Sequence, residues 1–203
     1  VQILSLNQAI PAADMHDFTA WCNEFLIWLQ QSTIGQDEND AENNHGVWFD
    51  AIRLSMALAT RQMALAEEIM NSAQKRLQIQ MDTAGFFPLE MTRTLSFHYS
   101  VFIVEGFLKI AAMGKRTQTS LWNYAPSGKQ LLPLAVDNLL PYLQQSATWP
   151  GKQIKAFDVS EAYSFLSVAA NQFNHVRSSD YLNRQTKLSP EKLYIYSLTQ
   201  FDL

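Results

Sequence analysis

The chain has few of the residues that build disulfide frameworks, turn-rich sheets or membrane spans. Cys22 is the single cysteine among 203 residues, which excludes an internal disulfide and a cysteine-based zinc cluster. Seven glycines and seven prolines are too few for a sandwich or barrel with many tight turns. No stretch reaches the about 18 apolar residues that a membrane span needs. We therefore expect neither a disulfide scaffold nor a transmembrane protein.

Positive charge is also scarce. The chain has 15 Lys and Arg residues against 19 Asp and Glu residues, which gives a formal net charge of -4. Nucleic acids and anionic membranes are usually bound through a broad positive field, so we expect neither as a partner. An anionic ligand would have to be bound by a few local cations.

Apolar residues are abundant, at 47% of the sequence, and their spacing is helical. The length and composition predict one all-α domain over residues 1–203. Residues 35–44 are polar and acidic, so we predict a solvated loop there that can act as a lid. The predicted helices cover 14–31, 45–60, 61–80, 131–145 and 160–173, with a long apolar helix ending near 114 and a helix start at 189–191.

A first polar cluster, at residues 43–50, opens one of these helices. Either Asn43 or Asn44 is explained as a helix cap, because an asparagine oxygen accepts from the free amides of the first turn. His45 is predicted on the inward face with Phe49 and Ile52, where the positive end of the helix favours a neutral ring. The bland alternative is capping plus a buried structural histidine. The functional alternative is a histidine that accepts a proton.

A second polar cluster, at residues 93–100, stands at the start of the long apolar helix. Arg93 needs an anionic partner there, which is either Glu90 in a structural ion pair or the carboxylate of a substrate. His98 and Tyr99 are neighbours and cannot share one helix face, so only one of them points toward Arg93. Arg93 and Tyr99 are six residues apart, a poor alignment on one helix, and their alignment improves if Arg93 belongs to the loop before the helix.

The two clusters together resemble the alginate lyase superfamily, near polysaccharide lyase family five. The motifs are Asn-Asn-His-Gly-x-Trp at 43–48 and, after a helical hairpin, Pro-Leu-Glu-x-x-Arg-Thr-x-Ser-x-His-Tyr-Ser at 88–100. The resemblance runs from about Trp21 to the region of Trp149. It implies an α/α toroid of antiparallel helical hairpins around a cleft. Because the family's domain is longer at its N-terminus, we expect this chain to lack the first helices, which would be a further part of the same protein.

The chemistry that the resemblance implies is β-elimination on a uronic acid of an anionic polysaccharide, alginate or another polyuronate. Asn44 and Arg93 match the family's carboxylate neutralisers, His45 its histidine and Tyr99 its catalytic tyrosine. We assign Asn43, Trp48, Glu90 and His98 to substrate binding, although Trp48 is equally explained as a core residue. The chain has Phe49 where many relatives have tyrosine, and the spacing from Arg93 leaves His98 as an alternative to Tyr99.

The resemblance further implies a secreted or periplasmic lyase with no cofactor and no obligatory metal. A second hypothesis is a helical polysaccharide-binding or scaffold protein with the same fold and no turnover. A zinc hydrolase using His45, His98 and His175 is a weaker third, because the sequence has no closely spaced histidine pair with a matching carboxylate.

Overall fold

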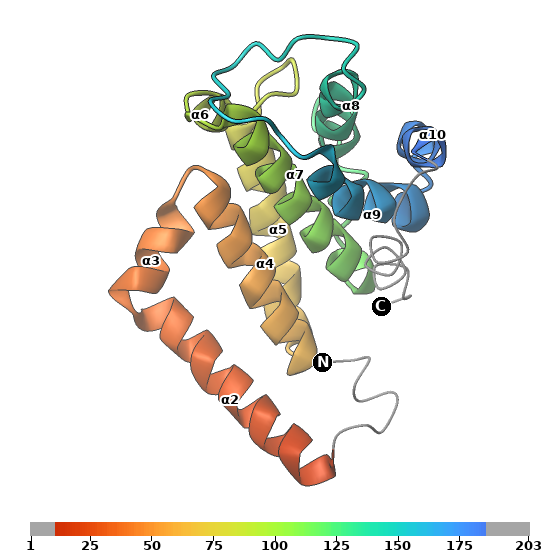
Figure 1. Cartoon of the computed structure of the whole chain (residues 1–203). Helices are drawn as coiled ribbons and strands as arrows, with labels where there is room; N and C mark the ends of the chain where they lie inside the picture. The colour runs from red at the N-terminus through yellow and green to blue at the C-terminus, as the bar shows by residue number, and fades with distance from the viewer. Residues whose placement is uncertain (1–10, 186–203) are drawn as a thin grey trace.

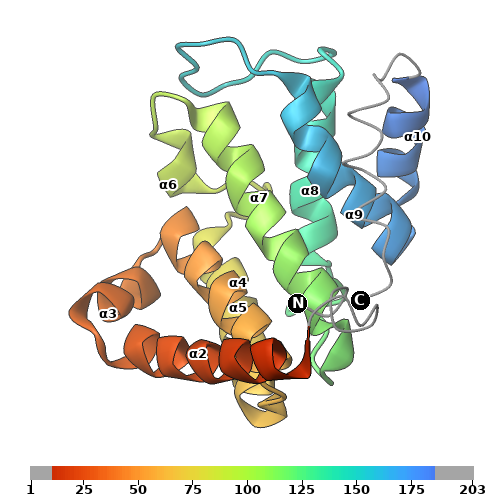
Figure 2. The ribbon, with the colours of Figure 1, turned by 60° about the horizontal axis from the view of Figure 1, so that its bottom comes forward.

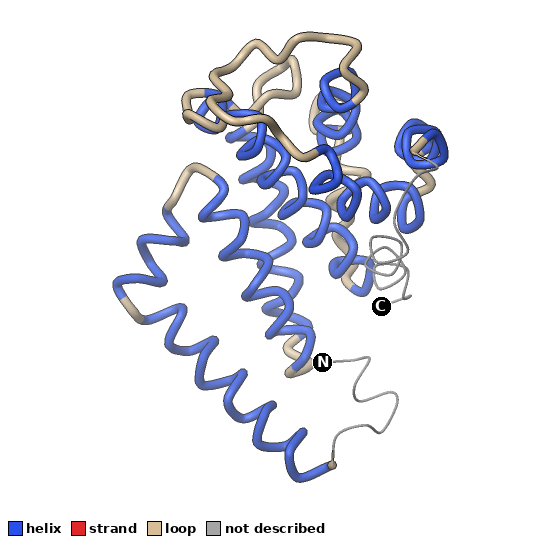
Figure 3. Tube along the Cα trace, viewed as in Figure 1, coloured by secondary structure: helices blue, strands red, loops and turns tan. Residues whose placement is uncertain are grey.

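The computed structural model describes residues 11–185, and this part of the chain is built from helices (Figures 1 and 3). Its regular structure outside the helices is one isolated bridge between Leu95 and Gln153. The elements are α2 (Ala12–Gln31), α3 (Thr33–Asp40), α4 (Asn44–Ala59), α5 (Met63–Gln80), α6 (Pro88–Met91), α7 (Ser96–Met113), η1 (Gly114–Arg116), α8 (Leu131–Leu143), η2 (Val159–Ala162), α9 (Tyr163–Phe173) and α10 (Val176–Arg184). The all-α prediction is confirmed.

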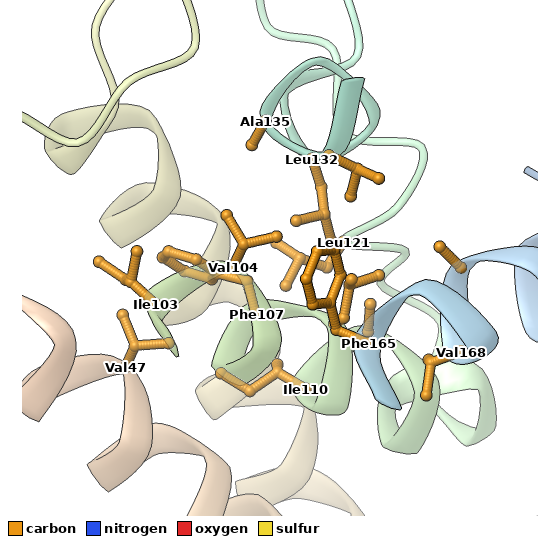
Figure 4. Packing of buried hydrophobic residues seen from close by; sticks show 14 of the residues in the cluster. Val47, Ile103, Val104, Phe107, Ile110, Leu121, Leu132, Ala135, Phe165 and Val168 are labelled. Carbon is orange, nitrogen blue, oxygen red and sulfur yellow. The ribbon is translucent and has the colours of Figure 1, made fainter. Parts of the chain in front are cut away.

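Helix α7 is the centre of the arrangement. It packs against α4, α5, α6, α8 and α9, and the views in Figures 1 and 2 show α4 and α7 descending side by side from the same end of the molecule. In Figure 4, Val104, Phe107 and Ile110 of α7 meet Val47 of α4 and Phe165 of α9. These side chains are at most 1% exposed. The N-terminal ends of α4 and α7, which carry the two polar clusters, are therefore held by one shared core.

The apolar length of α7 has a structural explanation. Together with η1 it forms a segment of 21 residues that contains an 18-residue window of mean hydropathy 1.2, so by length and composition it could cross a membrane, which we had not expected of any stretch. A buried core helix meets the same criterion, and 61% of this window is buried inside the protein. Its composition is that of a helix surrounded by other helices.

Helix α2 lies on the outside of this core and has two different faces. Cys22, Leu26 and Leu29 are buried on the inner face. On the outer side, Trp21 and Trp28 are 49% and 45% exposed, with Phe25 between them. The ring of Phe25 stacks on both tryptophans, with centroid distances of 5.2 Å and 5.6 Å. This column of aromatic rings follows from the alternating three- and four-residue spacing of a helix face.

The loop predicted at 35–44 is wrong for most of its length, because α3 occupies Thr33–Asp40. Ser32 caps the helix by accepting a hydrogen bond from the amide of Gly35 at 3.0 Å. Gly35 itself packs on the preceding helix, where a Cβ would lie 1.8 Å from the carbonyl oxygen of Leu29. A short polar helix is stabilised here by its cap and its close approach to α2, not by an apolar face. Only 41–43 connects α3 to α4.

The other helix predictions are confirmed within three residues at their ends. Pro88 begins the four-residue helix α6, which was not predicted, and Phe87 before it is extended, with φ -108° and ψ 97°. Helix α10 has no counterpart among the predicted helices. The helix start predicted at 189–191 lies outside the described residues.

A segment at residues 149–154, which we call the strap, closes the first turn of α7. The indole nitrogen of Trp149 donates to Ser96 Oγ at 2.7 Å, and the Ser96 amide donates to the Lys152 carbonyl at 2.9 Å. The Phe97 amide donates to Gln153 Oε1 at 3.1 Å. The strap thereby supplies partners for helix amides that have no acceptor within α7.

Candidate active site

Both asparagines at the start of α4 are engaged in hydrogen bonds. Asn43 is the cap, and its Oδ1 accepts from the His45 amide at 3.0 Å. Asn44 is only 4% exposed, and both its backbone amide and its side-chain Nδ2 donate to Glu90 Oε1, at 2.7 Å and 3.0 Å. One hydrogen of the Asn44 side-chain amide is therefore used to fix the side chain.

Glu90 on α6 holds Asn44 through the two hydrogen bonds that Asn44 donates to its carboxylate. Its side chain is 0% exposed and is used by Asn44, which favours a supporting role over the direct contact with a sugar that we predicted. The ion pair with Arg93 that was the bland alternative is also not observed, because Glu90 binds Asn44 instead. The second carboxylate oxygen of Glu90 is buried without a partner among the described residues.

Arg93 and Tyr99 come together at the start of α7. Arg93 lies in the turn between α6 and α7, where its amide donates to the Glu90 carbonyl at 3.1 Å. Its guanidinium carbon lies 4.0 Å from the centre of the Tyr99 ring. Within residues 11–185 neither the guanidinium nor the Tyr99 hydroxyl has a hydrogen-bond partner. A guanidinium stacked on a ring keeps its in-plane N–H groups, which are those that bind a carboxylate in a bidentate manner.

His45 faces outward, not inward as predicted. Its side chain is 54% exposed, and Ile52, which was predicted on the same buried face, is 42% exposed. Phe49 is buried as predicted, together with Val47, Asp50 and Leu54. The Nδ1 atom of His45 lies 3.0 Å from a carboxylate oxygen of Glu38 on α3. This contact orients the ring and leaves Nε2 free to face a ligand.

His98 points away from Arg93 and lies beside Tyr99. Its Nδ1 atom lies 3.1 Å from Glu161 of η2, and its ring packs edge-on against Tyr99 with a centroid distance of 5.8 Å. Of the two neighbours, Tyr99 is therefore the one that contacts Arg93. His98 is partly exposed and stays within reach of a ligand at this surface.

Trp48 is held between side chains of α7. Its ring stacks on Phe102 at a centroid distance of 4.7 Å, and the Lys109 ammonium lies 4.9 Å from its centre. Gly106 lies between these two residues on α7, where a Cβ would come within 3.4 Å of the indole. Because Phe102 and Lys109 both pack on the ring, the structural interpretation of Trp48 is favoured over a sugar platform.

Four of the predicted residues lie along one set of contacts. Asn44 binds Glu90, the Glu90 carbonyl holds the turn with Arg93, and Arg93 covers Tyr99. The sequence interpretation missed Glu38 and Glu161, the carboxylate partners of the two histidines. Glu38 is seven residues from His45 across a helix boundary, and no local spacing indicates such a pair.

Two further features concern ligand sites. Among the described residues no three His, Cys, Asp or Glu side chains are grouped in a way that could hold a metal ion. A cavity of about 230 Å³ lies at the opposite end of α7 from Tyr99, where Gly114, Lys115 and Phe173 contribute to its lining. It contains none of the predicted site residues.

Comparison with known proteins identifies the family and the fold. The sequence matches the alginate lyase family over residues 1–149. Among solved structures, an alginate lyase from Bacteroides ovatus superimposes with a TM-score of 0.83 and 25% sequence identity. The match covers 96% of this chain and 53% of that protein, so this chain spans about half the length of the solved relative. No curated protein matches. The fold is that of an all-α toroid, and the chain belongs to the alginate lyase family.

Proposed function

We propose that this chain carries the catalytic centre of a polysaccharide lyase that cleaves alginate or a related polyuronate by β-elimination. The observation that carries the proposal is the contact between Arg93 and Tyr99. The Arg93 guanidinium, which can bind a carboxylate, has no anionic partner among the described residues. It lies against the Tyr99 ring, and the Tyr99 hydroxyl has no hydrogen-bond partner among these residues either. These are the two groups that the reaction requires at one uronate ring.

The Arg93 guanidinium and the remaining Asn44 N–H would bind the C6 carboxylate of the sugar. The C5 proton is weakly acidic because its removal places negative charge on that carboxylate. Donors that are already in position stabilise this charge without reorganising during the reaction. Glu90 contributes by holding the Asn44 amide in one orientation.

Tyr99 and His45 would move the protons. A base takes the C5 proton, the C4–O bond breaks, the departing oxygen takes a proton, and a C4–C5 double bond remains. On mannuronate the departing proton and oxygen lie on one side of the ring, so Tyr99 alone serves as base and then as acid. On guluronate the two roles divide between His45 and Tyr99.

The alternative is a polysaccharide-binding protein of the same fold without turnover. It is favoured by the formal net charge of -4, which gives the chain no broad positive field for drawing in an anionic substrate. In that case Arg93 and Asn44 would still bind a uronate carboxylate, but Tyr99 would not transfer a proton.

One assay separates the two. The chain is incubated with polymannuronate, polyguluronate and other polyuronates, and the ultraviolet absorbance of the unsaturated product is followed with and without a chelator. Rising absorbance in the presence of chelator supports a lyase that needs no metal. Binding of a polyuronate without any rise in absorbance supports the alternative.

A further inference from the structure

Arg76 of α5 makes three hydrogen bonds around the start of α4. Its Nε donates to Asp50 Oδ2 at 2.8 Å, its Nη1 to the Ala41 carbonyl at 2.9 Å and its Nη2 to the Asn39 carbonyl at 2.9 Å. The side chain is 11% exposed. Three acceptors in three directions use the planar fork of a guanidinium, which a lysine cannot reproduce.

Gly46 of the first motif leaves space for the Arg76 side chain because it has no Cβ. A Cβ at Gly46 would lie 2.1 Å from Arg76 Nη1 and 2.3 Å from the Ala41 carbonyl oxygen. Any other residue would therefore displace the guanidinium or the connection between α3 and α4. The motif glycine is explained by this close approach.

Asp50 anchors Arg76 from the side of α4. It is 0% exposed, and burial raises the pKa of its carboxyl group while the nearby Arg76 and Arg53 oppose that shift. A buried carboxylate is tolerated when it is paired and hydrogen-bonded. The pair thus fixes the guanidinium on α4 before it reaches α3.

The two carbonyls held by Arg76 lie next to the carboxylate that orients His45. Asn39 directly follows Glu38 in α3, and Ala41 ends that helix. Glu38 in turn lies 3.0 Å from His45 Nδ1. Arg76 is therefore connected to the His45 ring through the end of α3 and Glu38. The Arg76 guanidinium also complements the partial negative charge at the C-terminus of α3.

We propose that Arg76 is a positioning residue for His45, which acts by holding the C-terminal end of α3 so that Glu38 directs Nε2 of His45 toward the substrate. Arg76 itself is too enclosed by its three partners to contact a sugar. The inference rests on the proposed function for its catalytic meaning and on the contacts above for its geometry.

The test combines Arg76→Lys with Glu38→Gln. Displacing a catalytic group by about 1 Å costs on the order of 10- to 100-fold in kcat. We therefore expect Arg76→Lys to lower kcat in that range with a smaller change in KM. In the Glu38→Gln background the same substitution should lower kcat by less than about twofold, because residues that act through one another are not additive. Lys75→Gln, at an exposed neighbouring position of α5, is the matched control and should leave kcat unchanged.

A second measurement does not depend on turnover. The ring nitrogen signals of His45, recorded by NMR on histidine-labelled chain, should change in Arg76→Lys and in Gly46→Ala as they do in Glu38→Gln. Gly46→Ala reaches the same contact from the other side and keeps the test decisive if Arg76→Lys does not fold. Additive losses of kcat, or His45 signals unchanged in a folded Arg76→Lys or Gly46→Ala variant, would overturn the inference. A wild-type chain inactive on all polyuronates would overturn the proposed function, and the NMR result would still decide the positioning role.

Discussion

The guanidinium of Arg93 lies over the ring of Tyr99 at 4.0 Å, and this contact ties the turn after α6 to the first turn of α7. A cation over an aromatic face contributes about 0.5–2 kcal/mol, depending on how far the pair is desolvated. The contact also determines where a bound carboxylate would lie relative to the phenol. Catalysis and local order therefore depend on the same pair of side chains.

Tyr99→Phe should abolish most turnover while keeping binding. The substitution removes one hydroxyl and keeps the ring on which Arg93 lies, so we expect kcat to fall by about 10²- to 10⁴-fold with little change in KM. Initial rates of unsaturated product formation measure both. Tyr124→Phe, whose hydroxyl bonds Gln78 away from the site, is the control. Unchanged turnover in Tyr99→Phe would assign the proton transfer to His98 or His45.

Arg93→Lys tests the carboxylate fork separately from the charge. Lysine keeps the positive charge but loses the planar pair of donors and the flat stacking surface. We expect kcat/KM to fall on the order of 100-fold, the usual cost of removing a preorganised donor to developing charge. Arg177→Lys, in an ion pair with Asp137 on another part of the molecule, should retain wild-type kinetics. Equal kinetics for Arg93→Lys and wild type would exclude a bidentate contact.

Trp48 should matter for stability more than for sugar affinity. Trp48→Ala removes a ring packed between Phe102 and Lys109, and we expect a loss of about 3 kcal/mol in the free energy of unfolding. Trp48→Phe retains much of the packing and should leave KM nearly unchanged. Urea unfolding and polyuronate titrations give the two quantities. A large rise in KM for Trp48→Phe at unchanged stability would return Trp48 to the substrate site.

His175 should make the protein less stable at mildly acidic pH. Burial lowers the pKa of His175 from its usual 6.5, and the nearby Asp137 offsets the shift only in part. Between the folded pKa and 6.5 the unfolded chain binds more protons, so lowering the pH through this window lowers the free energy of unfolding. Denaturant unfolding between about pH 7.5 and pH 5 should show a weaker pH dependence in His175→Gln than in wild type. The exposed His16→Gln should follow wild type, and identical slopes for all three proteins would contradict the prediction.

The sequence predicted the longer helices that bury apolar residues and missed the short helices α3, α6 and α10. Helix α7 and the α4–α5 hairpin were predicted because their apolar spacing reflects the contacts they make. Helix α3 is polar and short, and two of its supports come from Arg76, more than thirty residues later in the chain. The spacing of residues within a short stretch of sequence does not indicate such a long-range partner.

The orientation of His45 was predicted wrongly for a related reason. The prediction took Phe49 and Ile52 to define the inner face of α4, as apolar residues usually do. In the structure Asp50 is buried on that helix, where it pairs with Arg76 of α5, and Ile52 turns outward. The residues of the site could be named from their motifs, but the carboxylates behind the histidines required the folded chain.

The strap has a consequence for how the polypeptide can be divided. The match to the family ends at residue 149, where the strap begins. A chain shortened at that point would leave the amides of Ser96 and Phe97 without the Lys152 carbonyl and the Gln153 side chain, close to Tyr99. The region matched by the family thus ends before the residues that hydrogen-bond the start of α7. The shortest polypeptide that keeps these bonds extends at least through residue 154.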